Sequence, residues 1–263
     1  MFQKKSLGQN FLKNKKILKK IVAVGGVKIG ETVLEIGPGE GDLTKELLNA
    51  GAKVVAVEKD DRLIPILSEL FEKELKNGSL TLIHGDISKI SIDELPLEDS
   101  YKLIANIPYY ITGLIIRTFL ESSKQPQTIV VLVQKEVAER ICTKDGKESL
   151  LSVSVKVYGN PVNEGLVKAG NFNPAPNVDS SILAIHNISK DYFTKNNIEE
   201  KRFFEVLKVS FAGKRKMLRG KLASFAKNGE NIEEILKKAD IPETARAEKV
   251  PYQNWGKLVK LIL

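Results

Sequence analysis

The sequence of 263 residues contains one cysteine, Cys142, and two histidines. A single cysteine excludes an internal disulfide, and so few cysteines and histidines argue against a zinc site. No apolar run approaches the roughly 18–20 residues that a membrane-spanning helix needs. The lysine-rich N-terminal segment is not followed by the apolar segment of a signal peptide. We therefore expect a cytoplasmic, metal-free protein of one large or two modest domains.

The net charge of +8 is concentrated in two segments. Residues 1–30 contain eight lysines and no acid, and residues 201–222 contain eight basic residues and one acid, so the remaining residues carry a net charge of −7. Clustered lysine and arginine favour a polyanion such as RNA, because they displace counterions from phosphates, whereas a solvated face that maintains solubility is the alternative. The residues that we assign to RNA are Lys4, Lys5, Lys214, Arg215, Lys216, Arg219 and Lys221.

Short β-branched segments alternate with helical patterns up to about residue 188. The expected strands are 32–36, 53–58, 80–84, 101–105, 128–133, 151–158 and 182–186, and the expected helices between the first of them are 41–50 and 62–76. This alternation predicts a parallel α/β sheet, and the last two strands predict an antiparallel hairpin at its edge. Beyond residue 188 only helices are expected, at 199–212, 214–226, 232–239 and 253–263. The expected domains are therefore 1–188 and a small helical domain, 189–263.

A glycine-rich turn follows the first expected strand. Its glycines are Gly37, Gly39 and Gly41, and position 42 is Asp, where the dinucleotide-binding fingerprint requires glycine. Glu58 ends the second expected strand, where a carboxylate can accept hydrogen bonds from ribose hydroxyls, and Asp86 follows the third, where it can accept one from the amine of adenine. These residues favour an adenosine site without a phosphate cradle, and an ordinary tight turn is the alternative.

The fourth expected strand leads into Asn106-Ile107-Pro108-Tyr109. Proline favours an extended conformation of the preceding residue, so a backbone carbonyl can lie beside the Asn106 side-chain oxygen. Two such acceptors can hold an amino group, and Tyr109 offers a face on which a base can stack. The motif favours methyl transfer to N6 of adenine, and a structural turn with a buried tyrosine is the alternative.

As a set, these motifs resemble the KsgA family of ribosomal RNA adenine N6,N6-dimethyltransferases. The matching stretches are KSLGQNFL (5–12), EIGPGEG (35–41), Glu58, Gly85-Asp86, NIPY (106–109), NFNPAPNVDS (171–180) and FAGKRKMLR (211–219). The resemblance implies a Rossmann-like class I methyltransferase sheet that uses S-adenosylmethionine, a lid formed by the basic residues 1–30, and an RNA-binding helical domain.

The resemblance also implies roles for individual residues. Asn106, Ile107 and Pro108 would orient the target amine, and Tyr109 and Phe172 would stack on opposite faces of the target adenine. Asn106 would also touch the cofactor. The cofactor-binding residues implied are Asn10, Leu12, Gly37, Gly39, Glu58, Asp86 and Asn106.

The implied substrate is a pair of adjacent adenosines near the 3′ end of small-subunit (16S) ribosomal RNA in an immature 30S subunit, and the implied protein is monomeric. Two alternatives stay open. The first is a large-subunit (23S) adenine N6-methyltransferase of the macrolide-resistance type, and the second is a ribosome-assembly factor in which catalysis is secondary. An NAD-dependent oxidoreductase is disfavoured by Asp42.

Overall fold

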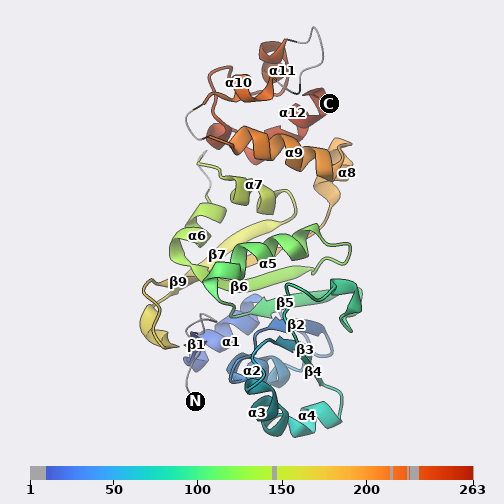
Figure 1. The fold of residues 1–263 in the computed structure, drawn as a ribbon, viewed down its shortest axis with the longest axis vertical. Helices are drawn as coiled ribbons and strands as arrows, with labels where there is room; N and C mark the ends of the chain where they lie inside the picture. The colour runs from blue at the N-terminus through green and yellow to red at the C-terminus, as the bar shows by residue number, and fades with distance from the viewer. Residues whose placement is uncertain (1–9, 144–146, 214–215, 224, 226–230, 263) are drawn as a thin grey trace. The chain divides into compact units, whose positions relative to one another are not determined.

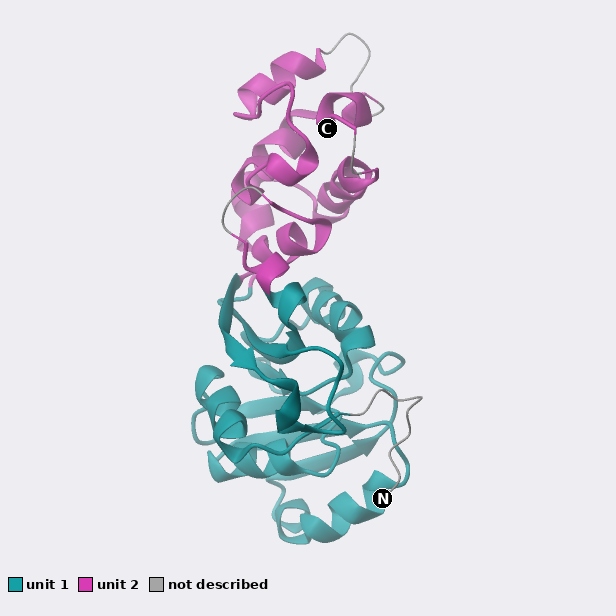
Figure 2. Cartoon of the chain, turned by 90° about the vertical axis from the view of Figure 1, so that its left-hand side faces the viewer, with its two compact units in different colours: residues 1–138, 160–188 teal, residues 139–159, 189–263 magenta. Residues whose placement is uncertain are grey.

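The computed structural model describes residues 10–143, 147–213, 216–223, 225 and 231–262. The chain divides into two compact units, the first built from residues up to 138 together with 160–188, and the second from 139–159 together with 189–263 (Figure 2). Residues 139–159 therefore group with the C-terminal helices and not with the sheet. The predicted boundary at residue 188 coincides with one of the points where the chain passes between the units.

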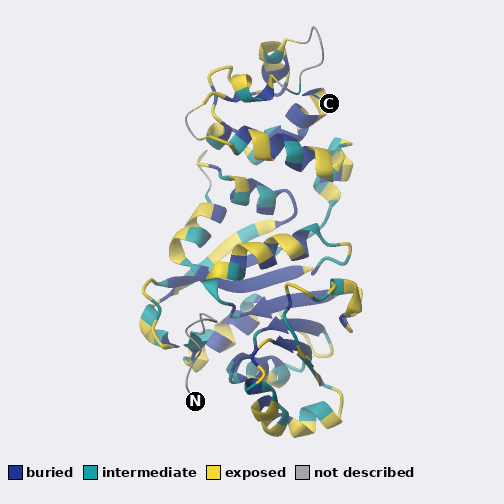
Figure 3. Cartoon of the chain, in the orientation of Figure 1, coloured by how far each residue is buried: buried dark blue, intermediate teal, exposed yellow. Residues whose placement is uncertain are grey.

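The first unit contains a seven-stranded sheet of order β4-β3-β2-β5-β6-β9-β7 (Figure 1). Its strands are β2 (Thr32–Ile36), β3 (Lys53–Glu58), β4 (Leu80–His84), β5 (Tyr101–Ala105), β6 (Thr128–Gln134), β7 (Asn160–Val167) and β9 (Ser180–His186). The pairs among β2 to β6 are parallel, whereas β9 is antiparallel to both β6 and β7. β2, β5 and most of β3 and β6 are buried, as Figure 3 shows, so these strands consist mainly of apolar residues, with Glu35 and Lys102 as buried charged exceptions.

The helices of the first unit are α1 (Lys15–Val24), α2 (Asp42–Asn49), α3 (Leu63–Leu70), α4 (Glu72–Lys76) and α5 (Tyr109–Glu121), and α6 (Lys135–Ile141) crosses the boundary between the units. The single helix expected at 62–76 is interrupted at Phe71, whose φ of −116° and ψ of 29° are not helical. The Phe71 side chain is buried against Gly41, where an added Cβ would lie 2.6 Å from the ring. Packing against the glycine turn therefore accompanies the break in the helix.

The strand expected at 151–158 was wrong, because these residues form helix α7 (Leu150–Lys156). Apolar residues alternate along this segment as they do in a strand. However, Ser149 caps the helix and forms a capping box with Ser152, and Val153 and Val155 are buried in the second unit. The antiparallel pair at the sheet edge exists, but it is formed by β7 and β9.

The second unit contains α7 and the helices α8 (Asp191–Asn196), α9 (Glu200–Phe211), α10 (Leu218–Leu222), α11 (Ile232–Lys238) and α12 (Tyr252–Ile262). The helices expected at 199–212, 232–239 and 253–263 are confirmed within one or two residues. The helix expected at 214–226 is shorter, since its described part begins at Leu218, after Met217 in an extended conformation. Trp255 of α12 is fully buried and packs against Phe211.

A two-stranded antiparallel sheet lies outside the main one and joins β1 (Phe11–Leu12) to β8 (Phe172–Asn173). Within the described residues, no helix is long and apolar enough to cross a membrane. The same residues contain no cluster of three or more His, Cys, Asp or Glu side chains that could hold a metal ion.

Candidate active site

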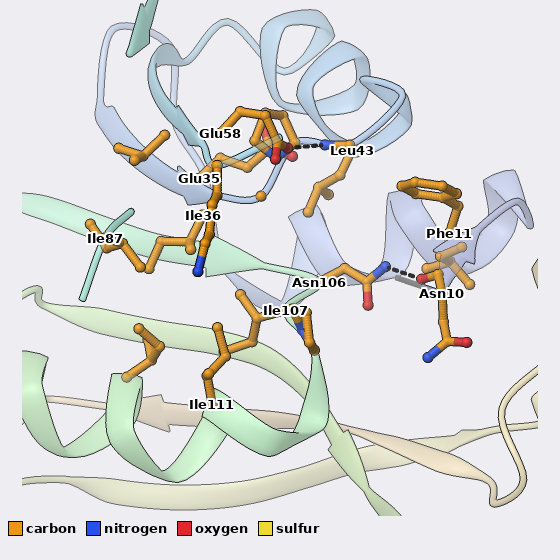
Figure 4. Close-up of a pocket in the computed structure, with 18 of the residues that line it drawn as sticks. Asn10, Phe11, Glu35, Ile36, Leu43, Glu58, Ile87, Asn106, Ile107 and Ile111 are labelled. Carbon is orange, nitrogen blue, oxygen red and sulfur yellow. Dashed lines mark hydrogen bonds between the residues drawn. The ribbon is translucent and has the colours of Figure 1, made fainter. Parts of the chain in front are cut away.

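A pocket of about 280 Å³ lies at the carboxyl ends of the parallel strands (Figure 4). Its walls come from β1, the glycine turn after β2, the ends of β3 and β4, and the segment that joins β5 to α5. Ligands of open α/β sheets bind at this edge, because the loops there converge from neighbouring strands. Every cofactor-binding residue predicted from the sequence lines this pocket, namely Asn10, Leu12, Gly37, Gly39, Glu58, Asp86 and Asn106.

The glycine turn requires residues without a side chain. Gly39 has a φ of +60°, and a Cβ there would lie 2.7 Å from the ring of Phe11. Gly41 is the left-handed N-cap of α2, with a φ of +84°. Both positions therefore exclude other residues by conformation and by space. Gly37, in contrast, has a φ of +66° and no heavy atom within 4 Å of an added Cβ, so the backbone there is open to a ligand.

Glu58 is buried and held by two backbone amides. Its Oε2 accepts a hydrogen bond from the amide of Gly39 at 3.1 Å, and its Oε1 accepts one from the amide of Asp60 at 2.7 Å. Each carboxylate oxygen can accept two bonds, so one position on each oxygen remains for hydroxyl groups of a ligand. Glu58 therefore joins the glycine turn to the end of β3 and presents a fixed acceptor pair to the pocket.

Asp86 follows β4 and is paired with Lys59, which the sequence pattern did not single out. Asp86 Oδ2 lies 2.8 Å from Lys59 Nζ, and Oδ1 accepts a hydrogen bond from the Ser88 hydroxyl at 2.7 Å. The Lys59 ammonium and the Ser88 hydroxyl lower the pKa of Asp86 to about 2. Asp86 is therefore ionised at neutral pH, and its oxygens can accept a hydrogen bond from an exocyclic amine.

Glu35 also lines the pocket and was missed as a site residue. It is 1% exposed, and its Oε2 accepts a hydrogen bond from the Thr44 hydroxyl at 2.6 Å. Burial raises the pKa of Glu35 to about 8, with a smaller contribution from the nearby Glu58 carboxylate, and the Thr44 hydroxyl opposes the shift. The available signal was its place at the start of the Glu35-x-Gly37 string.

The Asn106 amide is oriented by the N-terminal segment. Its Nδ2 donates a hydrogen bond to the backbone carbonyl of Asn10 at 3.1 Å, and its oxygen points away from Asn10 (Figure 4). This contact settles which end of the amide is the donor. Ile107 is buried, and Pro108 is the N-cap of α5; both line the pocket beside Asn106. The motif therefore places the Asn106 oxygen beside Ile107 and Pro108 in the pocket lining, and the backbone carbonyl expected as a second acceptor stays a prediction.

The two predicted stacking residues lie in different environments. Tyr109 is half-buried at the start of α5, lines the pocket, and its hydroxyl lies 2.5 Å from the Ser180 hydroxyl. Phe172 is 5% exposed, pairs with Leu12 across the two-stranded sheet, and packs in the hydrophobic core. It does not belong to the pocket lining. The structure therefore brings Tyr109, but not Phe172, together with the rest of the site.

The N-terminal segment is tied to the glycine turn by Lys13. Its ammonium forms ion pairs with Glu40 and with Asp42, the latter at 2.8 Å, and both acids line the pocket. On its other side, Asn14 Nδ2 donates a hydrogen bond to Asn171 Oδ1 at 2.8 Å. These contacts hold the short strand β1 along the edge of the pocket.

The predicted RNA-binding residues differ in their exposure and in their hydrogen-bond and ion-pair partners. Lys216 is exposed, Arg219 is paired with Glu233 at 3.0 Å, and Lys221 donates a hydrogen bond to the Ser210 carbonyl at 2.6 Å. Burial lowers the pKa of Lys221. The remaining members of the set, Lys4, Lys5, Lys214 and Arg215, lie outside the described residues.

Comparison with known proteins shows the family of this chain. Residues 2–263 match the model of the family described as Ribosomal RNA adenine dimethylase. The chain belongs to this family. A relative from Dehalococcoides mccartyi (strain CBDB1), named ribosomal RNA small subunit methyltransferase A, is 42% identical over 97% of this chain and 87% of its own length. A relative of the same name from Fusobacterium nucleatum is 37% identical over 98% of this chain and 97% of its own length.

Two solved structures share the fold. A dimethyladenosine transferase from Plasmodium falciparum has a TM-score of 0.77 and 27% identity, and the match covers 94% of this chain and 95% of that one. The 23S rRNA methyltransferase ErmE has a TM-score of 0.76 and 25% identity, with coverage of 96% and 99%. The fold class predicted from the sequence, a Rossmann-like sheet with an antiparallel edge and a helical C-terminal region, is confirmed.

The methyl donor of the family is S-adenosylmethionine, and the pocket residues fit it. The open backbone at Gly37, the held Glu58 carboxylate and the ionised Asp86 have the chemistry to bind an amino-acid portion, a ribose and an adenine amine respectively. Phe11, which the resemblance places in the lid, and Ile87, which the sequence pattern did not assign, also line the pocket. Ile87 could not be distinguished in sequence from an ordinary core residue.

Proposed function

We propose that this protein transfers methyl groups from S-adenosylmethionine to N6 of two adjacent adenosines near the 3′ end of small-subunit ribosomal RNA. The observation that carries the proposal is the Asn106 amide, whose nitrogen is bonded to Asn10 and whose oxygen is therefore directed elsewhere in the pocket. An exocyclic amine is the group that such an oxygen acceptor, beside a backbone carbonyl, can hold.

The residues act on the amine by orientation. The nitrogen lone pair of adenine N6 is delocalised into the ring, and acceptors on its hydrogens favour the form in which the lone pair points at the methyl group. We assign these acceptors to Asn106 Oδ1 and a backbone carbonyl of the Ile107–Pro108 turn. When bound, S-adenosylmethionine supplies an electrophilic methyl group on a positively charged sulfur. A strong base is not needed, because the alkylated nitrogen releases its proton readily.

The target base is held by stacking. We assign one face of the flipped adenine to Tyr109, which lines the pocket, and the other to Phe172. Because Phe172 is buried in β8, beside Leu12 of β1, and does not line the pocket, its stacking requires the β1–β8 sheet to move when RNA binds. The rate enhancement then comes chiefly from positioning and from fixed polar groups.

We also propose that the enzyme works as a cytoplasmic monomer on immature 30S subunits. In this proposal residues 1–188 form the methyltransferase domain with its N-terminal lid, and the basic residues of 189–263 bind RNA phosphates. The names of the relatives support the small subunit, whereas the similarity to ErmE supports a 23S substrate as the alternative.

The test compares methyl incorporation into immature small subunits and into protein-free 23S RNA. Wild-type protein is expected to label the small subunit, with label in N6,N6-dimethyladenosine. Asn106→Ala is expected to lower kcat by at least about a hundredfold, because the variant has no side-chain acceptor for the amine. The matched control is Asn163→Ala on the exposed edge strand β7, which should retain activity. Preferential labelling of 23S RNA would overturn the substrate, and near wild-type activity of Asn106→Ala would overturn the role of the amide.

The RNA contacts are tested separately by salt dependence. Replacing Lys214, Arg215 and Lys216 by Ala should weaken binding to immature subunits. A plot of log affinity against log salt concentration has a negative slope, and its magnitude should decrease by roughly 0.7–0.9 for each phosphate that the variant no longer neutralises. An unchanged slope would contradict an RNA-binding role for this segment.

A further inference from the structure

Ser180 is a buried hydroxyl residue that contacts the target-binding side of the pocket from a distant part of the chain. It is 0% exposed, and its Oγ lies 2.5 Å from the Tyr109 hydroxyl, 71 residues earlier in the sequence. We propose that Ser180 is a positioning residue that fixes the ring of Tyr109 for stacking on the target adenine. This inference rests on the stacking role assigned to Tyr109 in the proposed function.

The backbone at Ser180 is a fixed point. Ser180 is the first residue of β9, and it pairs with Gln134 of β6 on one side and with Val167 of β7 on the other. The residue before it is also held, since the Asp179 carbonyl accepts a hydrogen bond from the Lys135 amide at 3.0 Å. A hydroxyl carried by such a paired strand has little freedom, so a bond to it constrains its partner.

Tyr109, in contrast, lies at the edge of the pocket with part of its side chain exposed. It is the first residue of α5, directly after Pro108, so its backbone is placed by the turn and its ring can rotate about two side-chain torsions. The hydroxyl oxygen at the far end of the ring is bonded to Ser180, which fixes χ1 and with it the direction in which the ring extends, whereas rotation of the ring about its own axis leaves this oxygen in place. A ring whose axis is held in one direction before the base arrives loses less entropy when the base binds.

The Tyr109 hydroxyl also has the protonation state that this bond requires. Burial raises the pKa of Tyr109, and the nearby acids Asp179 and Glu136 raise it further, whereas the Ser180 bond opposes the shift. The phenol therefore remains protonated at neutral pH. Either hydroxyl can then donate to the other, and the ring stays uncharged beside the adenine.

The chain provides a matched control in the next residue. Ser181 is 1% exposed and lies in the same strand, but successive side chains of a strand point to opposite faces of the sheet. Ser181→Ala therefore removes a buried hydroxyl of the same kind from the other face. It is expected to leave methyl transfer unchanged.

The experiment is a double-mutant cycle on kcat/KM for methyl transfer to immature small subunits, with Ser180→Ala, Tyr109→Phe and the double variant. Each single variant breaks the same bond from one end, so each should lower kcat/KM by about fivefold, and the double variant by no more than either single one. The affinity for S-adenosylhomocysteine, measured by calorimetry, should stay within about twofold of wild type, because Ser180 does not line the pocket. Effects that multiply in the double variant, or a Ser180→Ala variant as active as wild type, would overturn the inference.

Two further variants distinguish a failure of this inference from misfolding of Ser180→Ala and from a failure of the stacking role proposed for Tyr109. If Ser180→Ala does not fold, Tyr109→Phe alone still tests the bond, since wild-type kcat/KM in a folded Tyr109→Phe protein would overturn the inference. Tyr109→Ala removes the stacking face itself and should lower kcat/KM much further, by about a hundredfold. Near wild-type activity of Tyr109→Ala would overturn the stacking role, whatever the cycle shows for Ser180.

Discussion

Glu35 provides a direct link between the pocket and the pH dependence of stability. The carboxyl group is buried in β2, and its pKa in the folded protein is about 8, against 4.5 for an ordinary glutamate. Glu35 therefore binds its proton more tightly in the folded protein than in the unfolded chain. Ionisation favours unfolding, so the free energy of unfolding should fall as the pH rises from about 5 to 8, and the decrease should level off above about pH 8.

The size of the effect follows from the two pKa values. Each pKa unit corresponds to about 1.4 kcal/mol, which gives a decrease of roughly 3 kcal/mol at pH 7 and roughly 5 kcal/mol above pH 8, relative to a protein in which Glu35 cannot ionise. The Glu35→Gln variant serves as this reference, because glutamine does not ionise. The glutamine carbonyl can still accept the hydrogen bond from Thr44, so the substitution removes the charge while it retains the contact.

The assay is urea unfolding at several pH values between about 5 and 9. Glu35→Gln should match the wild type below about pH 5 and become more stable by a few kcal/mol at about pH 8 to 9. Glu69→Gln, on the exposed face of α3, controls for the removal of a negative charge and should not reproduce this difference. A stability difference between Glu35→Gln and wild type that does not change with pH would refute the reasoning.

Three further predictions concern the cofactor site. Glu58→Gln places an NH₂ group against one of the two backbone amides whose hydrogen bonds the carboxylate accepts, so calorimetry should show at least about tenfold weaker binding of S-adenosylhomocysteine; equal affinity would contradict the role of Glu58. Because the pKa of Asp86 is about 2, Asp86→Asn should weaken this binding by a similar factor at every pH from about 4 to 9, and a decline in wild-type affinity with a midpoint near pH 4 would contradict an ionised Asp86. Lys13→Met should speed the dissociation of S-adenosylhomocysteine several-fold and make the rate less sensitive to salt, because it removes the ion pairs with Glu40 and Asp42. Lys19→Met, on the exposed face of α1, is the control, and identical rates for the two variants would show that these ion pairs do not hold the cofactor in its pocket.

The sequence predicted the parallel strands well because their signal is local. Residues 32–36 and 101–105 are buried along their whole length, and a short segment made up mainly of apolar residues and bounded by turns has few other structures available; Glu35 and Lys102 are its charged exceptions. The same local pattern failed at 151–158. There Val153 and Val155 alternate with small polar residues as in a half-buried strand, but the Ser149 cap and burial in the helical unit decide in favour of α7.

Site residues were predictable from the sequence where the residue type itself indicates ligand binding, and not where the role depends on a partner that only the fold brings near. Glu58 and Asp86 could be placed in the pocket lining from the sequence, because acids at the carboxyl ends of neighbouring parallel strands meet at the edge where ligands bind. Lys59 and Ser180 could not, because their roles depend on pairs formed through the fold, Lys59 with Asp86 and Ser180 with Tyr109. The burial of Phe172 beside Leu12 likewise accompanies the β1–β8 pairing, which no pattern within either two-residue strand indicates.

The contacts of Asn106 connect the N-terminal segment to the proposed site of methyl transfer. Its amide nitrogen is bonded to the carbonyl of Asn10, and the segment from Asn10 continues into Lys13, which is paired with two acids of the glycine turn. The turn is in turn bonded to Glu58 through the amide of Gly39. A displacement of residues 10–13 would therefore break the contact that orients the Asn106 amide and those that hold β1 at the edge of the pocket. If Asn106 is the acceptor for the target amine, as we propose, its orientation then depends on the same segment that borders the proposed cofactor site.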